Sequence, residues 1–176
     1  IRRPPRSTQG VSSAASDVYK RQIPALLIGL SRKPMYQVSR EIDFCYGHRL
    51  LNYEGKCRWL HGHNGRAVVT LEDQKLNHCG MVIDFTEIKQ YVSKWIDEHL
   101  DHRMILHQDD PLLPFLRDPQ QPLYIMDANP TAENIAKLIF EQIEREGYPV
   151  IEVRLWETPS SFATYKKPDP AQATGY

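Results

Sequence analysis

The strongest structural constraint in this chain begins after Met35, where apolar and polar side chains start to alternate. Side chains that alternate point to opposite faces of an extended segment, so residues 36–44 can bury one face and leave the other in water. The apolar face holds Tyr36, Val38, Ile42 and Phe44, and the polar face holds Gln37, Ser39, Glu41 and Asp43. The pattern therefore predicts a half-buried strand.

The middle of the chain predicts one more strand and a long helix. Residues 66–72 are rich in Val and Leu and favour a second strand, and residues 73–80 read as a loop. Asp84 and Glu87 have the spacing of a capping box, and apolar residues then recur at helical intervals, which predicts a helix over 85–99. Four prolines in residues 109–122 favour a loop.

The last third of the chain predicts a second helix and two strands. Asn129 is a good N-cap, Pro130 suits a first helical turn, and Gly147 is typical of a helix end. Residues 150–157 and 161–165 are predicted strands joined by a turn. The order ββααββ predicts an α+β domain, an antiparallel four-stranded sheet with two helices on one face.

The first 34 residues differ from the rest in composition. They hold seven Lys and Arg against one Asp, and residues 1–22 show no periodicity, as in a disordered basic tail or a transit peptide. They also resemble a translated sequencing adapter, so we interpret residues 1–34 as a tail that is not native to the protein. The predicted domain is then residues 35–167, followed by a C-terminal tail, 168–176.

Charge and apolar patterning exclude two classes of partner. Residues 35–176 hold fifteen Lys and Arg against twenty-one Asp and Glu, and this net charge of −6 gives no broad basic surface for nucleic acid. No apolar run approaches the roughly 20 residues that span a membrane, so we expect no membrane partner. Three widely spaced cysteines and no convincing secretory signal favour a reducing compartment, and we expect a cytoplasmic protein.

A His-x-His pair is the first candidate for chemistry. His61 and His63 can point to the same side of an extended segment, which is a chelating arrangement, although two surface histidines are the common alternative. His48 ends the first predicted strand and would lie beside them if the first two strands pair. Three neutral histidines with an open fourth position are typical of a catalytic zinc site.

Three further positions carry candidate acid-base or binding groups. Cys57 stands between two cations that favour its thiolate, so it is a candidate general base or, alternatively, a fourth zinc ligand that would close a structural site. Asp101 beside His102 is either an acid-base pair or an exposed helix end. Glu157 is a candidate anchor for a flat heterocycle, or a solvated strand end.

Six segments occur in the order known from one enzyme family. They are Phe44 to Leu50, Gly55 to Asn64, Gly80 to Phe85, Leu100 to His102, Pro130 to Asn134, and Trp156 to Thr158. Together they resemble the motif set of the 6-pyruvoyltetrahydropterin synthase family over about residues 35–167. The resemblance implies a tunnelling fold (T-fold) and a homo-oligomer whose sheets join into a barrel, with active sites at subunit interfaces.

The resemblance also implies roles for the candidate residues. In that family pattern His48, His61 and His63 hold Zn²⁺, and Cys57 is the base that removes a proton from carbon. Asp101 and His102 form a relay, and Glu157 grips the pterin. Thr131 and Glu133 match a motif near the pterin pocket, although these two residues are equally suited to cap the second helix.

The implied reaction is that of a lyase in queuosine biosynthesis. It converts 7,8-dihydroneopterin triphosphate to 6-carboxy-5,6,7,8-tetrahydropterin, releasing triphosphate and acetaldehyde, and the Cys57-x-x-x-His61-x-His63 spacing favours this branch. The alternatives are 6-pyruvoyltetrahydropterin synthase of tetrahydrobiopterin synthesis and a non-catalytic zinc- and pterin-binding module. Departures from the family pattern at Cys45-Tyr46-Gly47, Gly65 and His107 affect the expected shape of the side-chain pocket.

Overall fold

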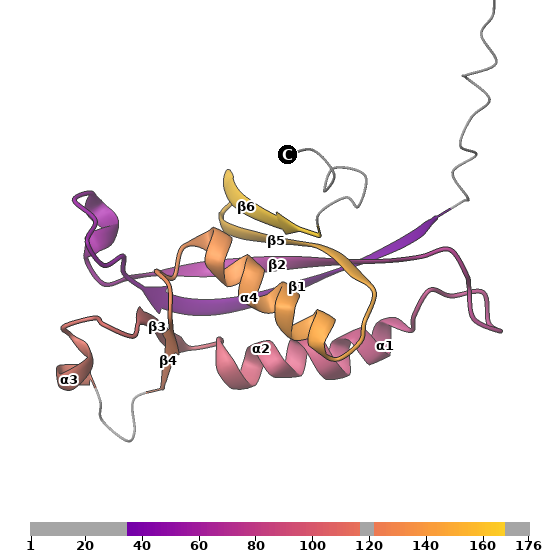
Figure 1. Cartoon of the computed structure of the whole chain (residues 1–176), viewed down its shortest axis with the longest axis horizontal. Coiled ribbons are helices and arrows are strands. Elements are labelled where there is room, and N and C mark those ends of the chain that lie inside the picture. The colour runs from indigo at the N-terminus through magenta and orange to yellow at the C-terminus, as the bar shows by residue number, and fades with distance from the viewer. Residues whose placement is uncertain (1–34, 117–121, 168–176) are drawn as a thin grey trace, which may run out of the picture. The chain divides into compact units, whose positions relative to one another are not determined.

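The structure is a computed structural model that describes residues 35–116 and 122–167. These residues form a six-stranded sheet in the order β4-β3-β1-β2-β5-β6 (Figure 1). The strands are β1 Tyr36–His48, β2 His61–Asp73, β3 Arg103–His107, β4 Leu123–Met126, β5 Val150–Thr158 and β6 Ser161–Lys166. The two tails predicted from the sequence, 1–34 and 168–176, lie outside the described residues.

A long antiparallel ribbon of β1 and β2 is the centre of the sheet. Its register is continuous from Tyr36 opposite Asp73 to His48 opposite His61. The even-numbered residues of β1 from Ile42 to His48 are buried, as the alternation predicts. The other face carries polar cross-strand pairs such as the Ser39 and Thr70 hydroxyls, 2.9 Å apart. The ribbon therefore has one face in the core and one face open to solvent.

The expectation of four antiparallel strands is wrong in both number and direction. β3 runs parallel to the end of β1, with Tyr46 opposite Arg103, and β4 runs parallel to β3. These strands have five and four residues, and the neighbours Ile105 and Leu106 in β3 are both fully buried. A short run that is buried on both faces shows no alternation, so periodicity cannot identify it.

The predicted helix over 85–99 is confirmed, with a change of pitch in its middle. It consists of α1 Phe85–Ile88, a π-helical turn η3 Lys89–Ser93 and α2 Lys94–His99. The Asp84 side chain accepts a hydrogen bond from the Thr86 N–H at 2.7 Å and caps the first turn. A short helix α3, Leu113–Leu116, lies in the proline-rich segment that the sequence predicts to be irregular.

The second predicted helix is α4, Ala132–Arg145, and it begins later than the sequence indicates. Its N-cap is Thr131, whose side chain accepts from the Asn134 N–H, and Asn129 is not the cap. The Asn129 amide instead pairs with the N–H and carbonyl of Leu51 at 2.7 and 2.9 Å. Asn129 thereby ties the start of the helix to the connection after β1.

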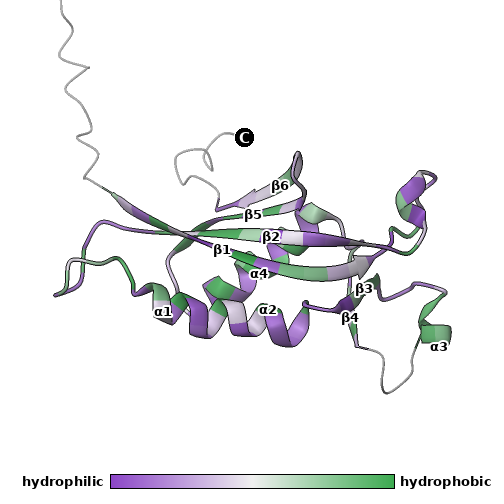
Figure 2. Cartoon of the chain, turned by 180° about the vertical axis from the view of Figure 1, so that it is seen from behind, coloured by the Kyte–Doolittle hydropathy of each residue, from purple (hydrophilic) through white to green (hydrophobic). Residues whose placement is uncertain are grey.

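The helices α1, α2 and α4 lie along one face of the sheet and close the core there (Figure 2). α4 packs on β5 and β6, the two predicted C-terminal strands, which are confirmed. The largest fully buried side chains include Leu71, Ile88, Ile96, Ile139 and Leu155, which come from the sheet and from both helical segments. Across the described residues, every helix is too short or too polar to cross a bilayer.

Candidate functional site

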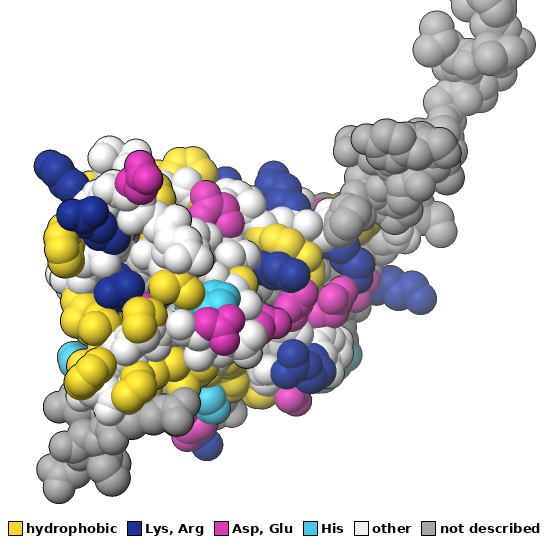
Figure 3. All heavy atoms as spheres, turned by 60° about the vertical axis from the view of Figure 1, so that its left-hand side comes forward, with side chains coloured by type: hydrophobic (Ala, Val, Ile, Leu, Met, Phe, Trp, Pro, Cys, Tyr) yellow, Lys and Arg dark blue, Asp and Glu magenta, His cyan; other side chains and the backbone are white. Residues whose placement is uncertain are grey.

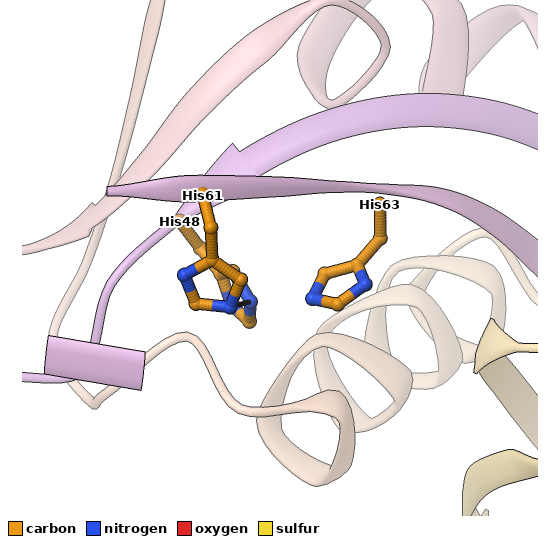
Figure 4. Close-up of side chains that lie close together, drawn as sticks. All are labelled: His48, His61 and His63. Carbon is orange, nitrogen blue, oxygen red and sulfur yellow. Dashed lines mark hydrogen bonds between the residues drawn. The ribbon is translucent and has the colours of Figure 1, made fainter. Parts of the chain in front are cut away.

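Three histidines converge where the β1–β2 ribbon ends. His48 pairs with His61 and Tyr46 pairs with His63 in the ladder, and directly paired residues project to the same face of a sheet. The ring centroids of the three imidazoles are 4.4 to 5.1 Å apart. Figure 4 shows all three rings on the same side of the ribbon. The convergence expected from the sequence is therefore present in the fold.

Backbone carbonyls orient two of the rings. His48 Nδ1 lies 2.6 Å from the Pro130 carbonyl oxygen, and His61 Nδ1 lies 2.8 Å from the Trp59 carbonyl oxygen. A carbonyl only accepts hydrogen bonds, so each Nδ1 carries a proton and each neutral ring presents an unprotonated Nε2. This is the outer-shell arrangement that orients metal-binding histidines.

The donor atoms fit a metal ion. Nε2 of His48 and Nε2 of His61 are 3.0 Å apart, and one nitrogen from each of the three rings lies within 4.8 Å of the others. Burial lowers the pKa of His48, which favours the neutral ring that ligates metal. A cation between facing lone pairs would attract both, so the three histidines, here called the His trio, are a candidate metal centre with room for further ligands.

Tyr46 and Glu157 stand beside the trio. The Tyr46 hydroxyl donates to Glu157 Oε1 at 3.0 Å, and the same oxygen lies 3.8 Å from His48 Nε2. Burial, and then the charge of Glu157, raise the pKa of Tyr46 far above its usual range, so its hydroxyl stays protonated. From the sequence, Tyr46 was noted only as a departure from the family pattern, although the alternation of β1 places it on the buried face.

The Tyr46 ring fills the space beside Gly65. A Cβ atom added at Gly65 would lie 2.8 Å from Cε1 of that ring. The glycine therefore leaves room for Tyr46 on the buried face of the ribbon.

The Asp101–His102 pair is held at the edge of β1. Asp101 Oδ2 lies 2.7 Å from His102 Nδ1, and Asp101 Oδ1 accepts from the Cys45 N–H at 2.7 Å. Partial burial raises the pKa of Asp101, but the hydrogen bonds from Cys45 and His102 outweigh it, and the net pKa is lowered. His102 has a positive φ of 54°, in the left-handed region that costs energy for a non-glycine residue.

An open cavity of ≈ 610 Å³ lies beside the end of the ribbon, and its lining includes Cys45, His61, His63 and His102. His48 and Asp101 are not among its lining residues. The three imidazoles project from the buried face of the ribbon, whereas Cys45 and the Asp101–His102 pair lie on its open side. Within one chain, the trio and the pair are therefore two separate groups.

Other predicted site residues lie apart from the trio. Cys57 is half-buried in the short helix η2, Lys56–Arg58, and within the described residues its thiol does not belong to the group of mutually close ligand atoms. Thr131 caps α4 and Glu133 lies exposed in its first turn. Among the remaining histidines, His78 is exposed, whereas His99 and His107 are half-buried.

Fold and site together define an α+β protein with a candidate metal centre and a hydrogen-bonded Asp101–His102 pair. The family model of 6-pyruvoyl tetrahydropterin synthase matches residues 37–168. The 6-carboxy-5,6,7,8-tetrahydropterin synthase of Rickettsia conorii is 39% identical over 135 residues, which cover 73% of this chain and 98% of that one. The chain therefore belongs to the 6-pyruvoyl tetrahydropterin synthase family, and the expectation of a lyase-type enzyme is confirmed.

Solved structures agree with this assignment. An uncharacterized protein from Wolinella succinogenes is 31% identical with a TM-score of 0.65, covering 77% of this chain and 99% of that one. The 6-pyruvoyl tetrahydropterin synthase of Caenorhabditis elegans is 27% identical with a TM-score of 0.57, covering 78% and 99%. The expected T-fold is thus confirmed, with six strands in place of four.

Proposed function

We propose that this chain uses zinc to convert 7,8-dihydroneopterin triphosphate to 6-carboxy-5,6,7,8-tetrahydropterin, with release of triphosphate and acetaldehyde, in queuosine biosynthesis. The observation that carries the proposal is the convergence of three histidine ring nitrogens at the end of the β1–β2 ribbon. Removal of a carbon-bound proton needs a base, a path for the proton, and stabilisation of the charge left behind. The His trio is the candidate for the last need, and the hydrogen-bonded Asp101–His102 pair is the candidate for the second.

The proposed metal site is the His trio. His48, His61 and His63 would hold Zn²⁺, because two of their Nδ1 atoms are already engaged by carbonyls and leave Nε2 as ligands. Bound there, Zn²⁺ would act as a Lewis acid toward oxygen atoms of the substrate side chain. The closed alternative would need Cys57 as a fourth ligand, and within the described residues of one chain its thiol lies outside the ligand group.

The proposed acid-base groups are Cys57 and the Asp101–His102 pair. Asp101 holds His102 Nδ1, which leaves Nε2 of that ring to exchange a proton in the cavity. Cys57 remains our proposed base. Within one chain it is not grouped with the trio, so we propose that assembly of subunits completes the site.

Exposed apolar side chains near the site support a homo-oligomer. Trp59 and Leu60 precede His61 directly, and their exposed fractions are 63% and 43%; Phe115 in α3 is 83% exposed. Figure 3, which brings the end of the molecule with η2 and α3 forward, shows hydrophobic side chains gathered there. Large exposed apolar residues in a group are typical of an interface. We propose active sites at such interfaces.

The pterin would be held by Glu157. Its carboxylate already accepts one hydrogen bond from Tyr46 and can accept more from the N–H groups of a flat heterocycle. Thr131 and Glu133 are proposed to lie near the same pocket, at the start of α4, where the adjacent Pro130 carbonyl orients His48. The segment before α4 would then join pterin binding to the metal centre.

A second candidate is the 6-pyruvoyltetrahydropterin synthase reaction, which the likeness to the Caenorhabditis elegans enzyme of that name favours. Both reactions would use the same groups, so product analysis separates them. The full chain loaded with zinc is incubated with 7,8-dihydroneopterin triphosphate, and pterins and acetaldehyde are measured by mass spectrometry. Carboxy product with acetaldehyde supports our proposal, whereas a pyruvoyl product without acetaldehyde supports the second candidate.

Two variants test the base in the same assay. Cys57→Ala is expected to lose turnover while zinc stays bound, and Cys79→Ala, which removes an exposed loop thiol, is expected to keep both. Loss of zinc in Cys57→Ala would instead indicate a metal ligand. Bound zinc and bound pterin with no conversion in wild type would identify a non-catalytic binding module.

A further inference from the structure

A second cluster of metal-binding side chains lies on the open side of β1. One ligand atom each from Cys45, Asp101 and His102 lies within 4.8 Å of the others, and these three residues are separate from the His trio. Sulfur, oxygen and nitrogen donors of these types are the ones that Zn²⁺ takes in proteins. We propose that Cys45, Asp101 and His102 form a second, lower-affinity binding site for Zn²⁺ and similar divalent transition metals.

The backbone holds the three residues together before any metal binds. The Cys45 N–H donates to Asp101 Oδ1 at 2.7 Å, and the His102 N–H donates to the Cys45 carbonyl oxygen at 2.6 Å. These bonds fix the end of α2 against β1. The fold therefore already orders the backbone of the three ligands, which lowers the entropy cost of binding a metal ion.

The side chains can reach a metal-binding geometry by small movements. Tetrahedral sites with bonds of about 2.0–2.3 Å place their ligand atoms about 3.3–3.8 Å apart. Asp101 Oδ2 and His102 Nδ1, now 2.7 Å apart, would open slightly as the metal ion replaces the proton between them. The His102 side chain is 78% exposed, so it is free to turn.

Cys45 supplies the sulfur donor of this site. Its Sγ donates a hydrogen bond to Asn64 Oδ1 at 3.2 Å. Metal binding would displace the thiol proton and leave a thiolate, toward which a turned Asn64 amide can donate. Cys45 and His102 line both the 610 Å³ cavity and a neighbouring one of ≈ 670 Å³, so ions have access.

Occupation of this site would remove the acid-base pair from use. If the proposed function holds, excess zinc inhibits the enzyme, because a metal on Asp101 and His102 prevents them from moving a proton. General acid-base groups contribute about 10²–10⁴-fold to rate, so inhibition of about 10²-fold or more is expected. A Cys45→Ser chain, which lacks the thiolate, should resist excess zinc.

The site is tested with Co²⁺ as the probe, in a readout that needs no turnover. The metal-free full chain is titrated with Co²⁺, and bound equivalents and the near-ultraviolet thiolate-to-cobalt absorption band are followed together. Wild type should bind two equivalents, and the band should grow with the second. The Cys45→Ser chain should lose the second equivalent of Co²⁺ and the absorption band, and it should keep the first equivalent. Binding of the first equivalent also shows that the variant is folded.

Matched variants identify the cysteine that gives rise to the thiolate-to-cobalt absorption band. Cys57→Ser and Cys79→Ser each remove another free thiol and should keep it, and His61→Ala should lose the first equivalent while the band remains. A wild-type chain without a thiolate band, a band that survives Cys45→Ser, or one lost in Cys57→Ser would overturn the second site. A failed activity assay with the expected band would count against the proposed function alone.

Discussion

Nε2 of His48 and Nε2 of His61 face each other at 3.0 Å, although thirteen positions separate the two residues in the chain. The distance follows from the ladder, in which the last residue of β1 is paired with the first residue of β2. Both rings turn Nδ1 toward a carbonyl, so Nε2 is the nitrogen that each neutral ring offers to a metal ion. A cation bound between the two Nε2 atoms would stabilise the folded chain.

Zinc is therefore expected to raise the melting temperature of the metal-free protein. A ligand at 100 times its Kd stabilises the folded state by about 2.7 kcal/mol, because it binds the native chain and not the unfolded one. His61→Ala should lose most of this gain, and His78→Ala, which changes an exposed loop histidine, should keep it. The measurement is calorimetry with and without Zn²⁺; equal gains in the two variants would contradict the trio as the metal site.

Gly65→Ala is expected to destabilise the protein by about 1–3 kcal/mol. The new methyl group would meet the Tyr46 ring at 2.8 Å and push it away from Glu157. Urea denaturation measures the loss. In a chain that already carries Tyr46→Ala, the same glycine substitution should cost less, since the clashing ring is gone. Equal costs in the two backgrounds would show that Gly65 and Tyr46 are not coupled.

Asp101→Asn is expected to lower stability at neutral pH and to matter less in acid. The pKa of Asp101 is lowered in the folded chain, so its charged form contributes stability above its ordinary pKa of 3.8, and that contribution is lost as pH falls through the lower folded value. Hydrogen bonds to a charged group contribute about 1.5–3 kcal/mol. The measurement is the free energy of unfolding of both chains at pH 7 and pH 3. A difference that is unchanged at low pH would refute this linkage.

The Arg49–Asp110 ion pair is expected to be the most sensitive salt bridge in the described residues. Arg49 Nε lies 3.0 Å from Asp110 Oδ2, without the alignment of a hydrogen bond, and the Asp110 side chain has no exposed surface. Asp110→Asn leaves the arginine charge without a partner and should cost about 3–5 kcal/mol.

The surface pair of Lys94 and Glu98 is the control for that substitution. Glu98→Gln breaks an exposed i,i+4 pair on α2, and such pairs contribute about 0.3–0.5 kcal/mol. Denaturant midpoints of the two variants give the comparison. A small effect of Asp110→Asn, similar to that of Glu98→Gln, would mean that the buried pair is solvated or rearranges easily.

Much of the fold was readable from the sequence because its signals are local. Alternation located β1, a capping box located the start of the first long helix, and turn residues separated β5 from β6. β3 carries no such signal because neighbouring residues on both of its faces are buried, and the edge strand β4 has only four residues, too few to show a period. Likewise, Thr131 and Asn129 are both residue types that favour an N-cap. Thr131 takes the cap of α4, because the Asn129 amide is engaged with the Leu51 backbone.

For the site, the sequence determined which atoms are available and the tertiary structure decided which of them meet. Histidine, aspartate and cysteine were identified as candidates from residue type and spacing alone, and the pairing of β1 with β2 brings the trio together as expected. The approach of Tyr46 to Glu157, of Pro130 to His48 and of Cys45 to Asp101 depends on packing between segments far apart in the chain. Local patterns carry no information about such long-range distances, because only the register of the strands and the packing of helices on the sheet set them.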